Sequence, residues 1–189
     1  MPHIQNASTL IIEAIFSFAL YIVLLRFWMQ WVRADFRNEI GQFIISATNP
    51  AIIPMRRLIP SIGVIDTATV LLAIAIALFK IYLLVLIAGG SITSYSFFKM
   101  LSVSIAAVLD SSIYVFLAAI FIGIIASWLN PNSYHPILSI VRSISEPLLA
   151  PARRLIPSMG GIDFSPMLVI LFLRVSQTLV IAPLYGLNI

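Results

Sequence analysis

A 13-residue motif that occurs twice constrains the fold of this chain more than any other feature. Residues 54–66 read PMRRLIPSIGVID and residues 151–163 read PARRLIPSMGGID, so ten of the 13 positions are identical. The same offset of 97 residues pairs Trp31 with Trp128. A period of this length exceeds the roughly 20–50 residues of a solenoid repeat. The sequence therefore predicts a duplicated half-protein whose two copies form one pseudo-symmetric unit.

The composition indicates that lipid is the solvent of this chain. Hydrophobic residues make up 61% of it, charged residues only 10%, and the mean hydropathy is +1.08. Soluble domains carry roughly 25% charged residues. We therefore predict an all-α membrane protein. Cysteine is absent from the sequence, which excludes disulfides, thiolate metal sites and cysteine nucleophiles.

Four apolar segments are long enough to cross a bilayer, since about 20 helical residues span a hydrocarbon core of about 30 Å. The predicted transmembrane helices are residues 9–32, 67–88, 106–129 and 166–187. Between the second and third, a short surface helix around Lys99 is expected. The predicted domains are a first repeat at 9–88, a linker at 89–105 and a second repeat at 106–187.

Two other segments show helical periodicity on one face only. In residues 36–51, apolar residues recur three and four positions apart and polar residues occupy the opposite face. Residues 136–150 repeat the pattern, although few identities remain. The apolar positions are Ile40, Phe43, Ile44, Ala47 and Ala51, and Ile137, Ile140, Val141, Ile144 and Leu148. This pattern is typical of an amphipathic helix that lies in the membrane interface.

The repeated motif itself is predicted to be a structured hinge. Pro54 and Pro60 remove backbone donors, so no long regular helix is expected to run through the motif. Gly63 permits a turn, and Asp66 is positioned to cap the next helix. An alternative role for Asp66, compatible with the first, is to clamp the arginine pair of its own hinge. The equivalent residues of the second hinge are Pro151, Pro157, Gly160 and Asp163.

The distribution of Lys and Arg predicts the orientation. Lys99 is the one basic residue between spans two and three, whereas the two motif-bearing loops contain seven. Those seven are Arg33, Arg37, Arg56, Arg57, Arg142, Arg153 and Arg154. By the positive-inside rule both motif loops face the cytoplasm and both termini the outside. Because each copy contains two spans, the copies form two helical hairpins of the same (parallel) orientation.

The doubled core RRLIPSxGxID, at residues 56–66 and 153–163, resembles the YggT family, called YlmG in other bacteria and in plastids. The resemblance extends over nearly the whole chain, and the two-copy form is similar to the proteobacterial branch. It implies a small multi-pass protein of the bacterial inner membrane. Family members are linked to osmotic tolerance and potassium uptake, to division and membrane organisation, and in plastids to nucleoid distribution and haem attachment to a cytochrome b. The resemblance implies no agreed catalytic residues.

The arginine pairs are the candidate binding residues. Arg56, Arg57, Arg153 and Arg154 lie where juxtamembrane cations attract anionic headgroups, at about 1 kcal/mol each. They are expected to bind anionic membrane lipids or an acidic segment of a membrane protein partner. The alternative is that they only anchor the topology.

Ionisable groups inside the spans are the second candidate site, since they are costly in a bilayer. Glu13 and Lys80 are close enough in depth to pair, and Asp110 and Gln177 hold the corresponding positions in the second copy. These contacts either fix helix packing or line an ion pathway. Arg174 has no acidic partner at its depth, and no role is assigned to it.

The sequence predicts no enzyme, metal site or cofactor. It has no nucleophile elbow, phosphate-binding loop or paired metal carboxylates, and nothing in it indicates nucleic-acid contact. His3 and His135 do not correspond between the copies. We predict a non-enzymatic protein that organises lipid or a membrane complex in osmotic adaptation. The alternative is a small ion transporter or channel component, for which a homo-oligomer would provide room.

Overall fold

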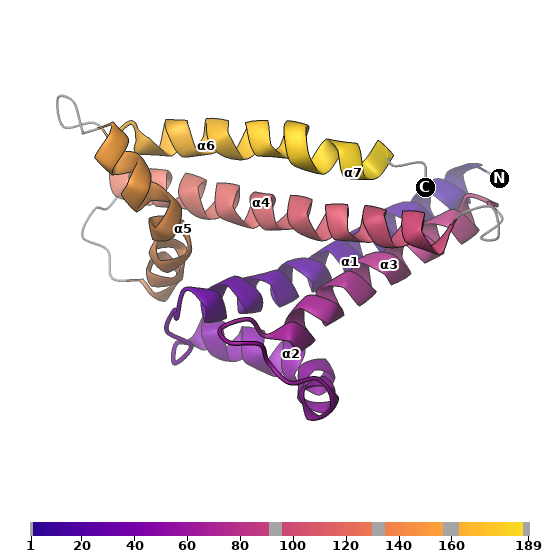
Figure 1. Cartoon of the computed structure of the whole chain (residues 1–189). Coiled ribbons are helices and arrows are strands. Elements are labelled where there is room, and N and C mark those ends of the chain that lie inside the picture. The colour runs from indigo at the N-terminus through magenta and orange to yellow at the C-terminus, as the bar shows by residue number, and fades with distance from the viewer. Residues whose placement is uncertain (1, 91–95, 130–134, 157–162, 187–189) are drawn as a thin grey trace.

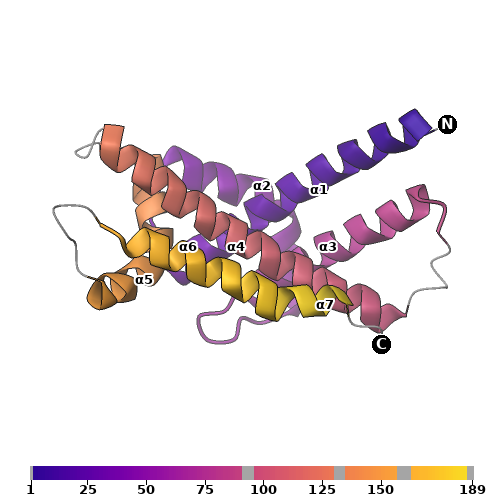
Figure 2. The same cartoon turned by 90° about the horizontal axis from the view of Figure 1, so that it is seen from above.

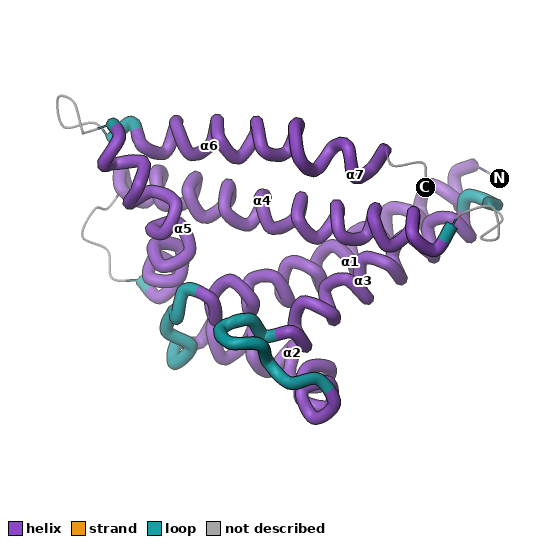
Figure 3. Tube along the Cα trace, in the orientation of Figure 1, coloured by secondary structure: helices purple, strands orange, loops and turns teal. Residues whose placement is uncertain are grey.

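The structure is a computed structural model that describes residues 2–90, 96–129, 135–156 and 163–186, with side chains from residue 5 onward. These residues form helices and connecting loops, without a named strand (Figure 3). The elements in chain order are α1 (Pro2–Trp31), α2 (Glu39–Leu58), α3 (Thr67–Ile87), α4 (Phe97–Leu129), α5 (Pro136–Leu155), α6 (Ser165–Ser176), the π-helical turn η2 (Gln177–Ile181) and α7 (Ala182–Gly186).

Four helical stretches are long and apolar enough to cross a membrane, which confirms the prediction of four transmembrane helices. They are Gln5–Trp31, Thr67–Ile87, Phe97–Leu129 and Ser165–Gly186, the last of which joins α6, η2 and α7. Most of their side chains face outward, because lipid rather than protein surrounds a small bundle.

The spans pair as two hairpins, one of α1 with α3 and one of α4 with α6, η2 and α7 (Figures 1 and 2). Helices α2 and α5 lie at the same end of the bundle, and the start of α1 and the end of α7 lie at the other. The predicted fold class is therefore confirmed: two hairpins of parallel orientation, each with an amphipathic helix between its spans.

Two apolar clusters hold these elements together. The first joins α1, α2 and α3 to α4 and α5, and its most buried members include Met29 and Ile144. The second lies within the second copy, between α4, α5 and α6, around Ile120. Trp28 on α1 packs edge-on against Phe116 on α4, with ring centroids 4.6 Å apart. The two copies thus share one core.

The separate surface helix that was predicted around Lys99 is wrong, because among the described residues Lys99 belongs to the helix of the third span. Helix α4 runs without interruption from Phe97 to Leu129. Proline is absent from this range, and Ser104 donates its hydroxyl to the carbonyl of Met100 without breaking the helix. The 33 residues measure about 50 Å, so the helix either tilts strongly or extends beyond the acyl region.

The first proline of each motif does not stop the interfacial helix, contrary to the prediction. Helix α2 continues through Pro50 and Pro54 to Leu58, and α5 continues through Pro147 and Pro151 to Leu155. Each pair is four residues apart and exposed, so the missing backbone hydrogen bonds fall on one outward face, where water or headgroups can reach the carbonyls. Each arginine pair therefore lies in the last helical turn rather than in a hinge.

Candidate functional site

The first hinge, residues 59–66, is a tight turn between α2 and α3. Ile62 and Ile65 exchange two backbone hydrogen bonds of 3.1 and 3.0 Å. Gly63 between them has φ +59°, in the left-handed region that favours glycine. A Cβ there would meet nothing within 4 Å, so the backbone and not the available space requires glycine. This turn brings Asp66 back toward the end of α2.

Asp66 clamps Arg56 across that turn. Its Oδ2 accepts from Arg56 Nη2 over 2.5 Å, and its Oδ1 accepts from Arg56 Nε over 3.3 Å. Oδ2 also accepts from the hydroxyl of Thr69. Asp66 is only 2% exposed. Burial raises the pKa of this carboxyl. The hydrogen bonds from Arg56 and Thr69 and the charge of Arg56 lower the pKa by more, so that it lies below its ordinary value.

The capping role predicted for Asp66 takes a different form. Asp66 does precede α3, but its side chain accepts no backbone N–H of that helix. Its two oxygens are occupied by Arg56 and Thr69 instead. Of the two roles that the sequence suggested, the structure shows the clamp.

The second hinge contains the same clamp in a more exposed form. Arg153 Nε donates to Asp163 Oδ2 over 3.0 Å, and Arg153 Nη1 donates to Glu146 over 2.7 Å. Asp163 Oδ1 accepts the backbone N–H of Ser165, the first residue of α6, so this aspartate both clamps and caps. Burial raises the pKa of Asp163, and the hydrogen bonds from Ser165 and Arg153 lower it by more. Pro157 and Gly160 lie outside the described residues.

The structure thus divides each arginine pair into two roles. Arg56 and Arg153 are held by carboxylates. Arg57 and Arg154 are exposed at the same ends of α2 and α5, with no hydrogen-bond or ion-pair partner in the described part of the chain. Within the two arginine pairs, these last two are therefore the cations that remain available to a ligand.

Arg26 anchors α2 to α1, a role that the sequence did not reveal. It is 5% exposed, and its Nη1 donates to Thr48 Oγ1, Asn49 Oδ1 and, more weakly, to the carbonyl of Ile45. The sequence signal was available, because Thr48 and Asn49 interrupt α2 near its apolar face.

The predicted pairing of Glu13 with Lys80 is wrong. Lys80 Nζ donates instead to Ser17 Oγ over 3.1 Å, one helical turn from Glu13 along α1. Glu13 is exposed, with no hydrogen bond or ion pair to another described residue. This hydrogen bond from Lys80 to the hydroxyl of Ser17 fixes the position of α3 along α1, which favours a packing role for Lys80.

The second copy contains a longer chain of polar side chains at the same depth. Gln177 Nε2 donates to Asp110 Oδ1 over 2.5 Å, and Arg174 Nη1 donates to Gln177 Oε1 over 2.8 Å. The guanidinium of Arg174 also lies 5.5 Å from the ring centre of Tyr114. Arg174, to which the sequence assigned no role, is therefore linked to Asp110 through Gln177.

This chain of contacts borders an irregular turn of the last span. Gln177 begins the π-helical turn η2, in which the N–H of Ala182 donates to the carbonyl of Gln177. Pro183 follows directly and has no N–H of its own. A cavity of about 340 Å³ lies here, lined by Asp110, Arg174, Gln177, Thr178, Ile181, Ala182 and Tyr185.

Among the described residues, no three His, Asp or Glu side chains gather as metal ligands. His135 is the N-cap of α5, where its Nδ1 accepts the N–H of Ile137. The side chain of His3 lies outside the described part.

Comparison with known proteins supports the two-copy architecture. A family model described as CCB3/YggT matches residues 5–87 and again residues 102–184. An uncharacterized protein of Pseudomonas aeruginosa is 42% identical over 181 residues, which covers 96% of this chain and 91% of that protein. An uncharacterized protein of Vibrio alginolyticus is 35% identical over 184 residues, covering 96% and 98%. The uncharacterized protein YggT of Escherichia coli K12 is 34% identical over 172 residues, covering 90% and 87%. No solved structure is significantly similar.

Proposed function

We propose a function from the premise that this chain belongs to the CCB3/YggT family: it is a non-enzymatic membrane protein whose two interfacial helices bind anionic lipid headgroups. Through this binding it organises lipid or a membrane complex during osmotic adaptation. The membrane is the bacterial inner membrane, with α2, α5 and both hinges on the cytoplasmic side and both termini in the periplasm. The excess of Arg in the motif-bearing loops supports this orientation.

The observation that carries the proposal is the division of each arginine pair. Arg56 is neutralised by the buried carboxylate of Asp66 and Arg153 by the exposed carboxylate of Asp163, which fixes the geometry of each hinge. Arg57 and Arg154 point out of the last turns of two amphipathic helices without a partner among the described residues. Topology anchoring alone would not require one arginine of each pair to be clamped.

The expected affinity follows from these two cations. Each exposed Arg near a negatively charged leaflet contributes about 1 kcal/mol, so Arg57 and Arg154 together contribute about 2 kcal/mol. That is a factor of roughly 30 in binding at low salt. The contribution falls as salt shortens the Debye length from about 30 Å at 0.01 M to about 3 Å at 1 M.

The test is a lipid-retention measurement on the full chain. The protein is purified in mild detergent, equilibrated with phosphatidylglycerol and phosphatidylcholine, and the retained lipids are counted by native mass spectrometry. The double variant Arg57→Gln, Arg154→Gln is expected to retain much less phosphatidylglycerol than wild type, with phosphatidylcholine unchanged.

Lys99→Gln is the control, because it removes one positive charge from the first turn of α4, which begins at the opposite end of the bundle from α2 and α5 (Figure 1). It should leave phosphatidylglycerol retention as it is. If the double variant and wild type retain equal amounts at low salt, the arginines only orient the protein and the proposal fails.

A second candidate function is an ion pathway, favoured by the contacts of Asp110, Gln177 and Arg174 beside η2. Single π-helical turns occur frequently at functional sites. Reconstituted liposomes would show a potassium or proton flux that Gln177→Leu abolishes. Lys80→Met should lower flux only if its contact with Ser17 continues the path; a purely packing role predicts a change in stability alone.

A further inference from the structure

The two copies differ in the size of two side chains, at the place where α1 and α4 contact their interfacial helices. Arg26 and Met29, both almost fully buried in the first copy, correspond to Gly123 and Ala126 in the second. A large side chain is thereby removed at each position. Gly123 is not forced by crowding, because a Cβ there would meet only Val141 Cγ1 at an ordinary 3.6 Å.

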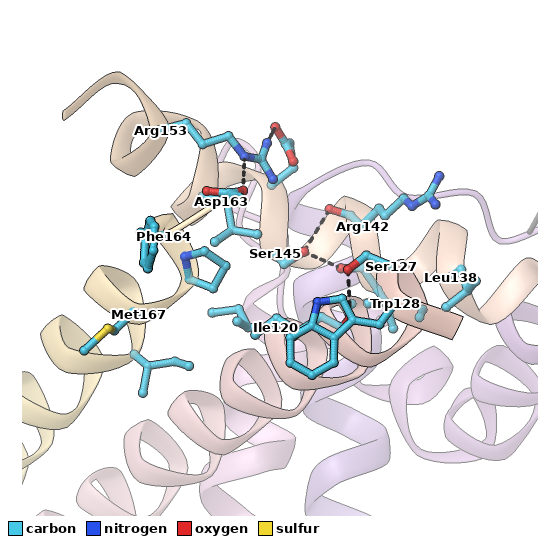
Figure 4. Close-up of a pocket in the computed structure, with 18 of the residues that line it drawn as sticks. Ile120, Ser127, Trp128, Leu138, Arg142, Ser145, Arg153, Asp163, Phe164 and Met167 are labelled. Carbon is cyan, nitrogen blue, oxygen red and sulfur yellow. Dashed lines mark hydrogen bonds and ion pairs between the residues drawn. The ribbon is translucent and has the colours of Figure 1, made fainter. Parts of the chain in front are cut away.

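Gly123 and Ala126 line a cavity of about 1070 Å³ between α4, α5 and α6 (Figure 4). Apolar side chains form most of its wall, among them Ile120, Trp128, Val141, Leu149 and Met167. Gly123 is about 9 Å from the end of α4 at Leu129, so the cavity opens at headgroup depth.

In the first copy, the position that corresponds to this cavity is occupied by the side chain of Arg26. There the guanidinium of Arg26 donates to Thr48, Asn49 and the carbonyl of Ile45. The second copy keeps an acceptor set at the matching positions of α5: Ser145, Glu146 and the carbonyl of Arg142. Glu146 is a stronger cation acceptor than the asparagine that it replaces. The acceptors are therefore retained, while the cation at the position of Arg26 is missing and Arg153 pairs with Glu146 Oε1 alone.

The rim of the cavity also gains a pair of opposite charges. Ile45 and Asn49 of the first copy become Arg142 and Glu146, four residues apart and so neighbours on one face of α5. Arg142 has no side-chain partner among the described residues, and Glu146 uses only Oε1, in its bond to Arg153. Figure 4 shows Arg142 and Arg153 on different sides of the cavity. The cavity is lined by four charged residues, and their two positive and two negative charges cancel: Arg142, Arg153, Glu146 and Asp163.

From this geometry we propose that the cavity of the second copy holds one phospholipid with a primary-amine headgroup, of the phosphatidylethanolamine type. Its ammonium takes the place that Arg26 fills in the first copy and donates to Glu146 and Ser145. Its phosphate pairs with Arg142, and an acyl chain lies against Ile120 and Leu149. A rim with no net charge and an added cation–anion pair fits a zwitterion better than an anionic lipid.

The site is distinct from the anionic-lipid surface of Arg57 and Arg154 and does not depend on it. Arg57 lies in the other copy, and neither arginine lines the cavity. A partner protein that inserts a basic side chain is the competing occupant. The apolar wall at headgroup depth favours the lipid, because an acyl chain fills it and a lone Lys or Arg side chain does not.

The test equilibrates the full chain in mild detergent with equal amounts of phosphatidylethanolamine, phosphatidylcholine and phosphatidylglycerol, and counts retained lipids by native mass spectrometry. Wild type should retain one phosphatidylethanolamine per chain in preference to phosphatidylcholine, because a trimethylammonium has no N–H to donate. Gly123→Arg should abolish this retention by restoring the missing cation. Glu146→Gln should weaken it about tenfold, the factor expected for loss of one charge-assisted hydrogen bond.

Two arms keep the result interpretable. The double variant Arg57→Gln, Arg154→Gln should still retain phosphatidylethanolamine, so failure of the anionic-lipid proposal would not affect this one. If Gly123→Arg does not fold, Glu146→Gln decides the question. The proposal is overturned by equal retention of phosphatidylcholine, by retention of phosphatidylglycerol only, by a Glu146→Gln variant that binds like wild type, or by a cavity that takes a basic peptide and no lipid.

Discussion

The two hinges contain the same arginine-aspartate clamp but differ in its burial, and this difference predicts unequal effects of one substitution. Asp66→Asn and Asp163→Asn each replace a carboxylate with an amide of nearly the same shape. In the first hinge both oxygens of Asp66 face donors, from Arg56 and from Thr69. Whichever way the amide turns, its NH₂ group meets another donor.

The size of the effect follows from exposure. The Asp66 side chain is 1% exposed and that of Asp163 is 39% exposed. A buried hydrogen bond to a charged group contributes about 1.5–3 kcal/mol, so Asp66→Asn should cost about 2–3 kcal/mol even though Arg56 itself is partly exposed. Water can replace the lost contacts of Asp163, so its substitution should cost about 0.5–1 kcal/mol.

The assay is thermal unfolding in mild detergent, followed by tryptophan fluorescence. At about 2–4 °C per kcal/mol for a chain of this size, Asp66→Asn should lower Tm by about 4–12 °C and Asp163→Asn by about 1–4 °C. Equal shifts, or a larger shift for Asp163→Asn, would refute the conclusion that the first clamp is the stronger.

The pH dependence provides an independent check on the same clamp. Because the pKa of Asp66 is lowered in the folded protein, its stabilisation is fully present above the unfolded-state pKa and is lost as pH falls through the folded-state pKa. The Tm difference between wild type and Asp66→Asn should therefore be constant near neutral pH and shrink below about pH 4. A difference that instead shrinks above pH 6 would exclude this carboxylate as its source.

Three further substitutions follow from single contacts. Arg26→Met should cost about 2–3 kcal/mol and speed hydrogen exchange in α2, because its buried acceptors lose a charged donor; unchanged exchange would show that Arg26 does not anchor this helix. Gly63→Ala should lower stability by about 1 kcal/mol, because a φ of +59° is unfavourable for alanine. The control Gly186→Ala should change Tm little. Equal effects of the two substitutions would contradict a backbone role for Gly63. Arg33→Gly should raise stability by about 1 kcal/mol, because Arg33 has φ 55°; a lower Tm would show that its side chain has a stabilising partner.

The parts of the fold that depend on hydrophobic period and length were predictable from the sequence. The four spans and the two amphipathic helices follow from apolar runs and one-sided periodicity. Their parallel arrangement follows from the duplication, because two spans per copy return the chain to the same side. These features depend on which residues face lipid and which face water, and many residues in the sequence contribute to that pattern.

The errors fell where one side chain chooses between competing partners. Local propensity suggested that Pro54 ends a helix, but an exposed proline removes only outward hydrogen bonds. Depth suggested that Lys80 pairs with Glu13, but Ser17 is the residue that faces it. The burial of Arg26 and the cavity beside Gly123 depend on packing between helices, which no periodicity records.

The shared sidedness of the two hinges can be measured by labelling, since the chain has no cysteine of its own. Single variants Arg57→Cys, Arg154→Cys and Lys99→Cys are treated with a membrane-impermeant maleimide, before and after the cells are permeabilised. We expect positions 57 and 154 to react only after permeabilisation and position 99 to react in intact cells. Labelling of positions 57 and 154 from opposite sides of the membrane would contradict two hairpins of the same orientation.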